Sequence, residues 1–169
     1  AQLAANSGTT QNFAAGEFHS LHVKTDGSLW AIGSNLYGQL GNGLSGSGQT
    51  INSTPIKILP NGVSSVSAAA GTSFFVKSNG SLWAMGYNHY GNLGDGTRTD
   101  SATPKQIINS GVVSVAASRA HTLVLKSDGS LWGMGNNGSG ALGVGVGASI
   151  YRLTPIKIVD GGVKTIAAG

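Results

Sequence analysis

Hydrophobic positions along the chain fall into short runs that polar and glycine-rich stretches separate. The runs "HSLHVK", "SFFVK" and "HTLVLK" each precede a turn, and "SLWAIG", "SLWAMG" or "SLWGMG" follows that turn. These runs are rich in β-branched and aromatic residues, and no 3.6-residue amphipathic period persists anywhere along the chain. The pattern therefore predicts an all-β fold that is built from short strands.

The turns between the paired runs carry a hairpin signal. They contain Asp26-Gly27, Asn79-Gly80 and Asp128-Gly129. Such a dipeptide between two apolar runs is the strongest short-range sign of a β-hairpin, and it is typical of a type I′ turn with positive φ at both central residues. We therefore predict three hairpins with turns of this type.

Each hairpin belongs to a longer unit that occurs three times. An Ala-rich run precedes the hairpin, and a Pro-led run ("TPIKI" or "TPKQI") and a Gly-Val corner follow its loop. Four short strands in a unit repeated about every 50 residues describe a four-stranded antiparallel blade of a β-propeller. We place the units at about 13–65, 66–114 and 115–162, with a flexible lead-in at 1–12 and the start of a fourth unit at 163–169.

Composition is consistent with a folded chain that has many turns. Hydrophobic residues make up 40% and charged residues 9% of the chain, and its 28 glycines show no collagen period. The formal net charge of +4 is spread over separated lysines, so a basic face for nucleic acid is not expected. The chain has no cysteine, which excludes disulfides and thiolate chemistry. No apolar run is long enough for a membrane span, so no membrane association is predicted.

A glycine-rich string within each unit carries a family resemblance. The pattern G-x-N-x-x-G-x-L-G-x-G stands here as "GSNLYGQLGNG", "GYNHYGNLGDG" and "GNNGSGALGVG". With the Gly-Ser-Leu-Trp before it and the Pro-led run after it, this string resembles the repeat of the regulator of chromosome condensation family, in a bacterial-type or engineered form. The resemblance covers Phe13 to Gly169 and implies a β-propeller, usually of seven blades. Three repeats are fewer than a closed propeller has, so we expect a partial propeller or a ring that self-association completes.

Candidate catalytic groups are few, and each has a structural interpretation. Trp30, Trp83 and Trp132 recur at one repeat position, which is typical of core residues. His19 and His121 share another position, which Thr72 fills in the middle unit, and we interpret them as structural. The carboxylates outside the hairpin turns show no recognisable acid–base pairing; they are Glu17, Asp95, Asp100 and Asp160. We therefore predict that the protein is not an enzyme and needs no cofactor or metal.

Residues that break the repeat pattern are the candidates for binding. Loops on a rigid scaffold concentrate binding residues, and Tyr and Arg are enriched at interaction hot spots. The candidates chosen in this way are Tyr37, His89, Tyr90, Arg98, Arg119, Tyr151 and Arg152.

The leading hypothesis is a non-enzymatic β-propeller scaffold that binds another protein through its blade loops. The family resemblance implies one alternative, a guanine-nucleotide exchange factor for a small GTPase. Similarity to bacterial propellers that inhibit β-lactamases implies another, and an engineered propeller fragment without a separate activity is a third. Low charge, abundant Ser, Thr, Asn and Gly, and the absence of cysteine resemble bacterial secreted or cell-surface repeat proteins, so we expect such a location.

Overall fold

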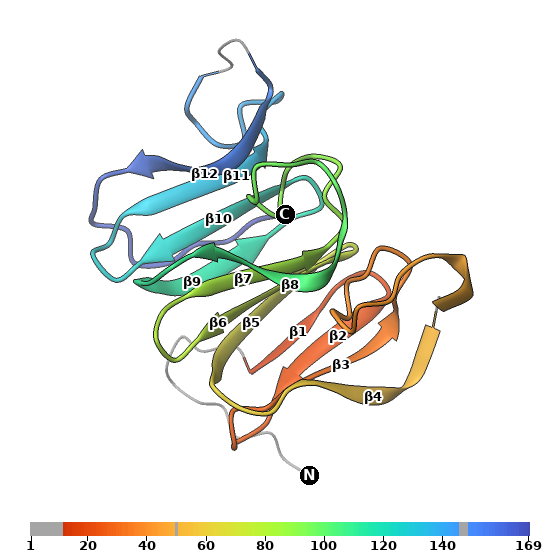
Figure 1. Cartoon of the computed structure of the whole chain (residues 1–169). Coiled ribbons are helices and arrows are strands. Elements are labelled where there is room, and N and C mark those ends of the chain that lie inside the picture. Colours follow the sequence, from red (N-terminus) through yellow and green to blue (C-terminus); the bar gives the residue numbers. More distant parts are fainter. Residues whose placement is uncertain (1–11, 50, 146–148) are drawn as a thin grey trace.

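The computed structural model describes residues 12–49, 51–145 and 149–169. Within these ranges the chain forms three four-stranded antiparallel sheets and a single short 3₁₀ turn, η1 (Ser47–Gln49). The sheets lie in a row, with the second between the first and the third (Figure 1). This arrangement confirms the predicted all-β architecture of four-stranded blades. The predicted lead-in at 1–12 lies almost entirely outside the described residues.

Each sheet is a meander in which strands that follow one another in the chain are neighbours. The first sheet contains β1 (Phe13–Ala15), β2 (His19–Val23), β3 (Leu29–Ser34) and β4 (Ile51–Leu59). The second contains β5 (Val63–Ala69), β6 (Thr72–Lys77), β7 (Leu82–Gly86) and β8 (Ser101–Ile108). The third contains β9 (Val112–Ala117), β10 (His121–Lys126), β11 (Leu131–Asn136) and β12 (Tyr151–Val159). Residues 163–169 form no strand with the described part of the chain, and the start of a fourth unit there stays a prediction.

The antiparallel order gives every sheet two different ends. The turn between its first and second strands and the long glycine-rich loop between its third and fourth strands lie together, and we call this the loop end. The hairpin turn and the connection to the next sheet lie at the opposite end, the turn end. Where the chain leaves each sheet at the turn end, a similar backbone hydrogen bond forms. The Val63 N–H donates to the Gly27 carbonyl at 3.1 Å, the Val112 N–H to the Gly80 carbonyl at 3.0 Å, and the Val163 N–H to the Gly129 carbonyl at 3.1 Å.

The hairpins are confirmed, but the prediction of a type I′ turn is wrong. Gly27 has a φ of 75°, whereas Ala70 is the one non-glycine residue of the described chain with positive φ, so Asp26 is not left-handed. Gly27 N–H donates to the Lys24 carbonyl at 2.9 Å and Lys24 N–H to the Ser28 carbonyl at 3.0 Å. This is a type I turn followed by a left-handed glycine. The Asp26 carboxylate accepts the N–H and the hydroxyl of Ser28, which fixes this longer turn.

The proline of each unit lies on the outermost strand of its sheet, as expected for an edge. The strands begin three or four residues before these prolines, at Ile51, Ser101 and Tyr151. Pairing of β3 with β4 shifts between Ala31 and Gly33, so the edge is irregular at this point. The proline therefore removes no regular ladder bond from the centre of a sheet.

Apolar side chains pack between neighbouring sheets and hold them together. Between the first two sheets, Leu21, Leu29 and Leu40 meet Phe75 and Met85. A second cluster lies between the other two sheets; it contains Phe74, Val76, Leu82, Leu93, Val124 and Met134. The first strands of neighbouring sheets contact one another, since β5 touches both β1 and β9. Their Ala-rich sequences allow this close approach.

The recurring tryptophans are half-buried and not fully buried as expected of core residues. Trp83 packs at the edge of the first cluster and Trp132 at the edge of the second. The Trp83 indole N–H donates to the Ser81 hydroxyl at 3.0 Å, and the Lys77 ammonium lies 4.4 Å from the ring centre. A lysine thus covers the outer face of the ring, and this explains why the indole does not need full burial.

Candidate functional site

Four aromatic rings gather at the loop end, where the first two sheets meet. The centre of the group is Tyr87, which follows the last residue of β7. Its ring centroid lies 5.0 Å from that of Tyr37, 4.5 Å from that of His89 and 5.8 Å from that of Tyr90. Edge and tilted contacts of this kind stabilise aromatic groups beyond the burial of their area. The four rings therefore form a defined aromatic surface.

A buried asparagine in each glycine-rich string holds the loop that carries these rings. In the second sheet, the Asn88 side-chain oxygen accepts the Leu93 N–H at 2.9 Å, and its amide donates to the Thr97 and Thr99 carbonyls. Asn35 and Asn137 accept the corresponding N–H groups in the other two loops. All three asparagines are fully buried. In each glycine-rich string, the buried asparagine thus fixes the loop, and the fixed loop positions the residues that differ between units.

The aromatic surface continues toward the third sheet through Arg98. Its Nε donates to the His89 carbonyl at 2.6 Å, and its guanidinium carbon lies 4.2 Å from the centre of the Tyr151 ring. The His89 imidazole in turn lies 3.6 Å from a carboxylate oxygen of Asp100. Side chains from the loops of two sheets are therefore joined in one continuous network.

A hollow of about 170 Å³ opens beside these rings. We call it the rim groove and define it by six of its lining residues: Glu17, Phe18, Leu36, Tyr37, Tyr87 and Arg119. Phe18 is 70% exposed and Leu36 is 40% exposed, which is unusual for large apolar side chains in a polar loop region. Arg119 comes from the turn between β9 and β10, so the groove has contributions from all three sheets.

Arginine and aromatic side chains lie together at the loop end. Arg98, Arg119 and Arg152 are the only arginines of the chain, and all of them lie at the loop end. Burial, followed by the neighbouring Tyr90, raises the pKa of Tyr87, so this ring keeps its hydroxyl proton at neutral pH. The groove therefore presents neutral rings, arginine and one carboxylate side by side.

The structure brings most of the sequence-predicted residues together. Tyr37, His89 and Tyr90 contact Tyr87, Arg119 lines the same groove, and the Arg98–Tyr151 pair extends it. Arg152 is different, because its guanidinium donates to the carbonyls of Ser149 and Gly145 in its own loop.

The sequence interpretation did not name four of the six groove residues as binding residues: Glu17, Phe18, Leu36 and Tyr87. Tyr87 occupies a variable position inside the glycine-rich string, where Ser34 and Asn136 stand in the other units. An aromatic residue at that position was the available signal. Phe18 lies in the turn before β2, and nothing in its local pattern shows that it faces the groove.

The residues considered for catalysis have structural roles. His19 is buried, its Nε2 lies 2.8 Å from the Ser73 hydroxyl, and burial lowers its pKa to about 4 against the raising effect of the Ala70 carbonyl. His121 lies 2.9 Å from the Ser118 hydroxyl, and burial lowers its pKa as well. Among the described residues, no three His, Asp or Glu side chains are grouped as metal ligands would be. No helix in the described ranges has the length and apolar character to cross a bilayer.

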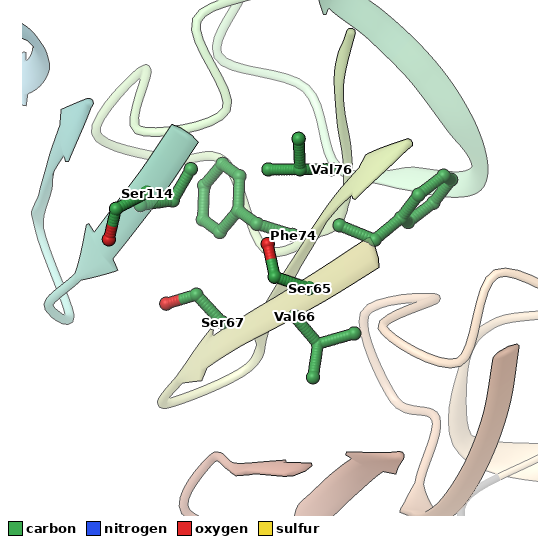
Figure 2. A pocket seen from close by; sticks show the side chains of 8 residues that line it. Ser65, Val66, Ser67, Phe74, Val76 and Ser114 are labelled. Carbon is green, nitrogen blue, oxygen red and sulfur yellow. The ribbon is translucent and has the colours of Figure 1, made fainter. Parts of the chain in front are cut away.

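A second hollow lies between the inner strands β5, β6 and β9. Its volume is about 10 Å³, the space of roughly one water molecule. Figure 2 shows Val66 pointing from β5 toward the first sheet, while Ser65 and Phe74 lie on the opposite side of that strand, toward Ser114. This hollow is too small for a ligand, whereas the rim groove gathers aromatic and arginine side chains.

Three stacked four-stranded blades with glycine-rich loops define a segment of a β-propeller. Two family models match the chain, and both describe the regulator of chromosome condensation (RCC1) repeat. One matches residues 26–76 and 79–125, which is more than half of the chain, and the other matches residues 11–39 and 112–141. The chain belongs to the RCC1 repeat family.

Two relatives share sequence with part of the chain. The regulator of chromosome condensation of Xenopus laevis is 33% identical over 88 residues, which are 52% of this chain and 20% of that protein. The X-linked retinitis pigmentosa GTPase regulator homolog of Caenorhabditis elegans is 29% identical over 84 residues, which are 50% of this chain and 6% of that protein. Both relatives are named as regulators, and the matches span a fifth or less of their length.

Solved structures with the same fold include human WBSCR16, with a TM-score of 0.79 and 23% identity over 93% of this chain and 42% of that one. Yeast RCC1 (Prp20), solved with Kap60 bound to it, has a TM-score of 0.76 and 25% identity over 93% of this chain and 39% of that one. Prp20p of Saccharomyces cerevisiae, solved with a study of its binding to Gsp1p and histones, has a TM-score of 0.75 and 21% identity over 92% and 40% of the two chains. These likenesses show the β-propeller fold.

Proposed function

We propose that the chain is a non-enzymatic β-propeller segment that binds another protein through the rim groove. The observation that supports this most strongly is the gathering of aromatic and arginine side chains from the loops of all three sheets at one end. The opposite end carries tight turns, whose asparagine and aspartate side chains are engaged in local hydrogen bonds. Binding residues are therefore concentrated on one end of a rigid scaffold.

The chemistry of the groove fits a protein surface. Tyrosine and arginine are enriched at the centres of protein interfaces, and exposed apolar side chains such as Phe18 and Leu36 gain most from being covered. Glu17 and Asp100 lie among the arginines, so the surface has no uniform positive charge of the kind that attracts a phosphate backbone. A partner with its own mixed polar and apolar surface is favoured.

The non-enzymatic part of the proposal rests on how the reactive side chains are used. The proton of the Ser73 hydroxyl is donated to the Gln39 carbonyl, and His19 is held against that hydroxyl. Asp95 is paired with Lys105, and Asp128 is bound within its hairpin turn. Each of these groups has a structural partner within the fold, so none of them is available as a general base or a nucleophile.

The relatives suggest which partners to test first. The yeast protein is described with Gsp1p, histones and Kap60, all of which are proteins, and the C. elegans relative is named for a GTPase regulator. The second candidate function is therefore guanine-nucleotide exchange on a small GTPase. A secreted or cell-surface location, which composition suggested, stays a prediction.

The test is a binding measurement with purified partners. The chain is immobilised and presented with Gsp1p, histones, Kap60 and a class A β-lactamase in turn. We expect one of them to bind, and we expect the loop-end variant F18S/R119A to weaken that binding about tenfold or more, because exposed anchor residues of an interface are lost. The matched variant P60S/K164A removes an exposed apolar residue and an exposed cation at the turn end and should bind like the original chain.

Binding that survives F18S/R119A unchanged would refute the rim groove as the site, and failure to bind any of the four proteins would count against the partner class. Release of a fluorescent guanine nucleotide from a small GTPase separates the two candidate functions. Acceleration by the chain would favour exchange activity, whereas binding without acceleration favours a scaffold.

A further inference from the structure

The chain contains the dipeptide Asn-Gly four times, and the structure gives one of the four a different environment. The dipeptides are Asn42-Gly43, Asn61-Gly62, Asn79-Gly80 and Asn137-Gly138. In such a dipeptide the backbone nitrogen of glycine can attack the side-chain amide carbon of asparagine, because glycine has no Cβ to obstruct the approach. The attack requires that the two groups come together, so hydrogen bonds that hold either of them elsewhere oppose it.

In three of the four dipeptides, hydrogen bonds hold both reacting groups. The asparagine side-chain oxygen accepts a hydrogen bond in each case, from the Asn35 amide to Asn42 at 2.9 Å, from the Ser81 N–H to Asn79 at 3.0 Å and from the Leu142 N–H to Asn137 at 2.9 Å. The glycine N–H also donates in each case, from Gly43 to the Ala102 carbonyl at 2.9 Å, from Gly80 to the Lys77 carbonyl at 2.8 Å and from Gly138 to the Asn136 side chain at 2.6 Å. These three sites are therefore protected by the fold.

Asn61-Gly62 has neither kind of hydrogen bond. Asn61 is exposed, and its side chain makes no hydrogen bond to another described residue. The Gly62 N–H donates to no backbone carbonyl of the described chain. Gly62 has a φ of 81°, and no atom of the described residues lies within 4 Å of its Cβ position. The side chain and the nitrogen can therefore meet without breaking a hydrogen bond of the fold.

The chain on either side of this dipeptide is fixed. Before it, Leu59 at the end of β4 pairs with Leu29. After it, the Val63 N–H donates to the Gly27 carbonyl, and β5 begins. Asn61 thus lies in a short exposed connection between the first two sheets.

We propose that Asn61 is the site at which the folded chain undergoes deamidation. The Gly62 nitrogen forms a bond to the Cγ of Asn61 and loses its proton to a base from solvent. The bond from Cγ to the amide nitrogen breaks, and ammonia leaves with a proton from water. The product is a cyclic succinimide, which a water molecule then opens. Attack of water at Cγ gives aspartate, and attack at the backbone carbonyl carbon gives isoaspartate.

The two products differ in what they do to the connection. Both place a new carboxylate at position 61. Aspartate leaves the backbone as it was, whereas isoaspartate routes the backbone through the side-chain methylene and lengthens it. The added length falls between two fixed points, the pairing of Leu59 with Leu29 and the bond from Val63 to Gly27. Isoaspartate therefore disturbs the connection between the first two sheets.

Parallel incubation of the folded chain and of the chain unfolded in urea tests the proposal. Both samples are held at mildly alkaline pH, and peptide mapping by mass spectrometry follows each asparagine over time. In the folded chain Asn61 should react about tenfold or more faster than the other three asparagines, because their hydrogen bonds must open first. In urea the four should react at similar rates, since the dipeptide is the same. Transfer of a labelled methyl group by a protein isoaspartyl methyltransferase measures the isoaspartate separately.

Two variants remove and transfer the site. N61S places at this position the residue that the next connection has there, Ser110, and the folded variant should stay unmodified over the same period. S110N creates an Asn-Gly pair in the connection between the second and third sheets, where Ser110 is exposed and the Gly111 N–H donates to no backbone carbonyl of the described chain. The new asparagine should react at about the rate of Asn61. Circular dichroism and thermal unfolding check that both variants are folded.

Three results would overturn the proposal. One is a folded chain in which another of the four asparagines reacts as fast as Asn61. Another is an Asn61 that stays intact in the folded chain while the unfolded chain reacts. The third is a folded S110N variant whose new asparagine stays intact, because that would show that the open connection is not the cause of the reaction. None of these measurements involves the rim groove, so they do not depend on the proposed partner binding.

Discussion

The Nε2 atom of His19 lies 2.8 Å from the hydroxyl oxygen of Ser73, and this contact joins the first sheet to the second. Because the Ser73 hydroxyl donates its proton to the Gln39 carbonyl, the His19 nitrogen that faces it must carry a hydrogen. The other ring nitrogen is buried and has no hydrogen-bond partner within the described residues. His19 is therefore a neutral side chain that is built into the contact between two blades.

Acidification should weaken the fold through His19. Burial lowers its pKa to about 4 in the folded chain, so between that value and the ordinary pKa of 6.5 the unfolded chain binds more protons than the folded chain. The contribution of neutral His19 to the free energy of unfolding is therefore complete above pH 6.5. The free energy of unfolding falls by about 3 kcal/mol in total as the pH is lowered from 6.5 to 4. Urea unfolding at several pH values measures this slope.

The variant H19T places at this position the residue that the second unit already has there, Thr72. This variant should remove most of the pH dependence of the free energy of unfolding, whatever its effect on stability at neutral pH. His89 is exposed, so H89T serves as the control and should keep the slope. An unchanged slope in H19T would show that another group causes the acid sensitivity.

Replacing Asn88 with aspartate should disorder the loop that carries the aromatic rings. Aspartate can still accept the Leu93 N–H, but it cannot donate to the Thr97 and Thr99 carbonyls, and it would lie beside the carboxylate of Asp95. We expect a loss of about 2–3 kcal/mol in the free energy of unfolding at neutral pH, from unsatisfied acceptors and like-charge repulsion. Chemical denaturation measures it, and part of the loss should return at acidic pH as a carboxylate gains a proton.

The ion pair of Lys105 and Asp95 should stabilise the chain more than an exposed pair does. Burial alone would raise the pKa of Asp95, but the hydrogen bonds from Lys105 and Thr97 outweigh it and hold the pKa below its ordinary value. The stabilisation is present above the unfolded pKa of 3.8 and is lost as the pH falls through the lower folded pKa.

The variant K105M should therefore cost about 1–2 kcal/mol at neutral pH and much less under strongly acidic conditions. Thermal unfolding at both pH values provides the comparison. K157M breaks the exposed pair with Asp160, whose side chain is 95% exposed, and should change stability by less than about 0.5 kcal/mol. Equal losses of stability in K105M and K157M would contradict the expectation that the Lys105–Asp95 pair stabilises the chain more than the exposed pair.

Gly86 should tolerate no side chain, because its backbone and its surroundings both exclude one. Its φ is 101°, and a Cβ would lie 2.3 Å from the Gly71 carbonyl oxygen. G86A should destabilise the chain by about 3 kcal/mol or more, since backbone strain adds to the clash. Gly43 also has a positive φ, of 83°, but no atom of the described residues lies within 4 Å of its Cβ position, so G43A should cost only about 1 kcal/mol. Differential scanning calorimetry of the two variants separates strain from clash.

Local pattern predicted the strands and hairpins, but the details depended on contacts that local pattern does not encode. The apolar runs around Trp30, Trp83 and Trp132 became paired strands as predicted. The turn type was wrong because the Asp26 side chain binds Ser28 and stabilises a longer turn, which an Asp-Gly pair alone does not reveal.

The candidate site was predicted only in part for a similar reason. Residues such as Tyr37 and Tyr90 stood out because they break the repeat, and the structure places both beside Tyr87. Phe18 and Arg119 line one groove although about a hundred residues separate them, because the stacking of three sheets brings their turns to one end. Repeat spacing shows that the sheets stack, but it does not give the angle between them, so these neighbours could not be named in advance.

One backbone hydrogen bond recurs at each connection between units, and it bears on how such chains change length. It joins Val63 to Gly27, Val112 to Gly80 and Val163 to Gly129. Each bond connects one sheet to the segment that follows it in the same way. The segment 63–111 therefore supplies the donor of one such bond, Val63, and the acceptor of the next, Gly80. Duplicating or deleting the gene segment for one unit therefore leaves the same backbone donor and acceptor at every remaining connection between sheets.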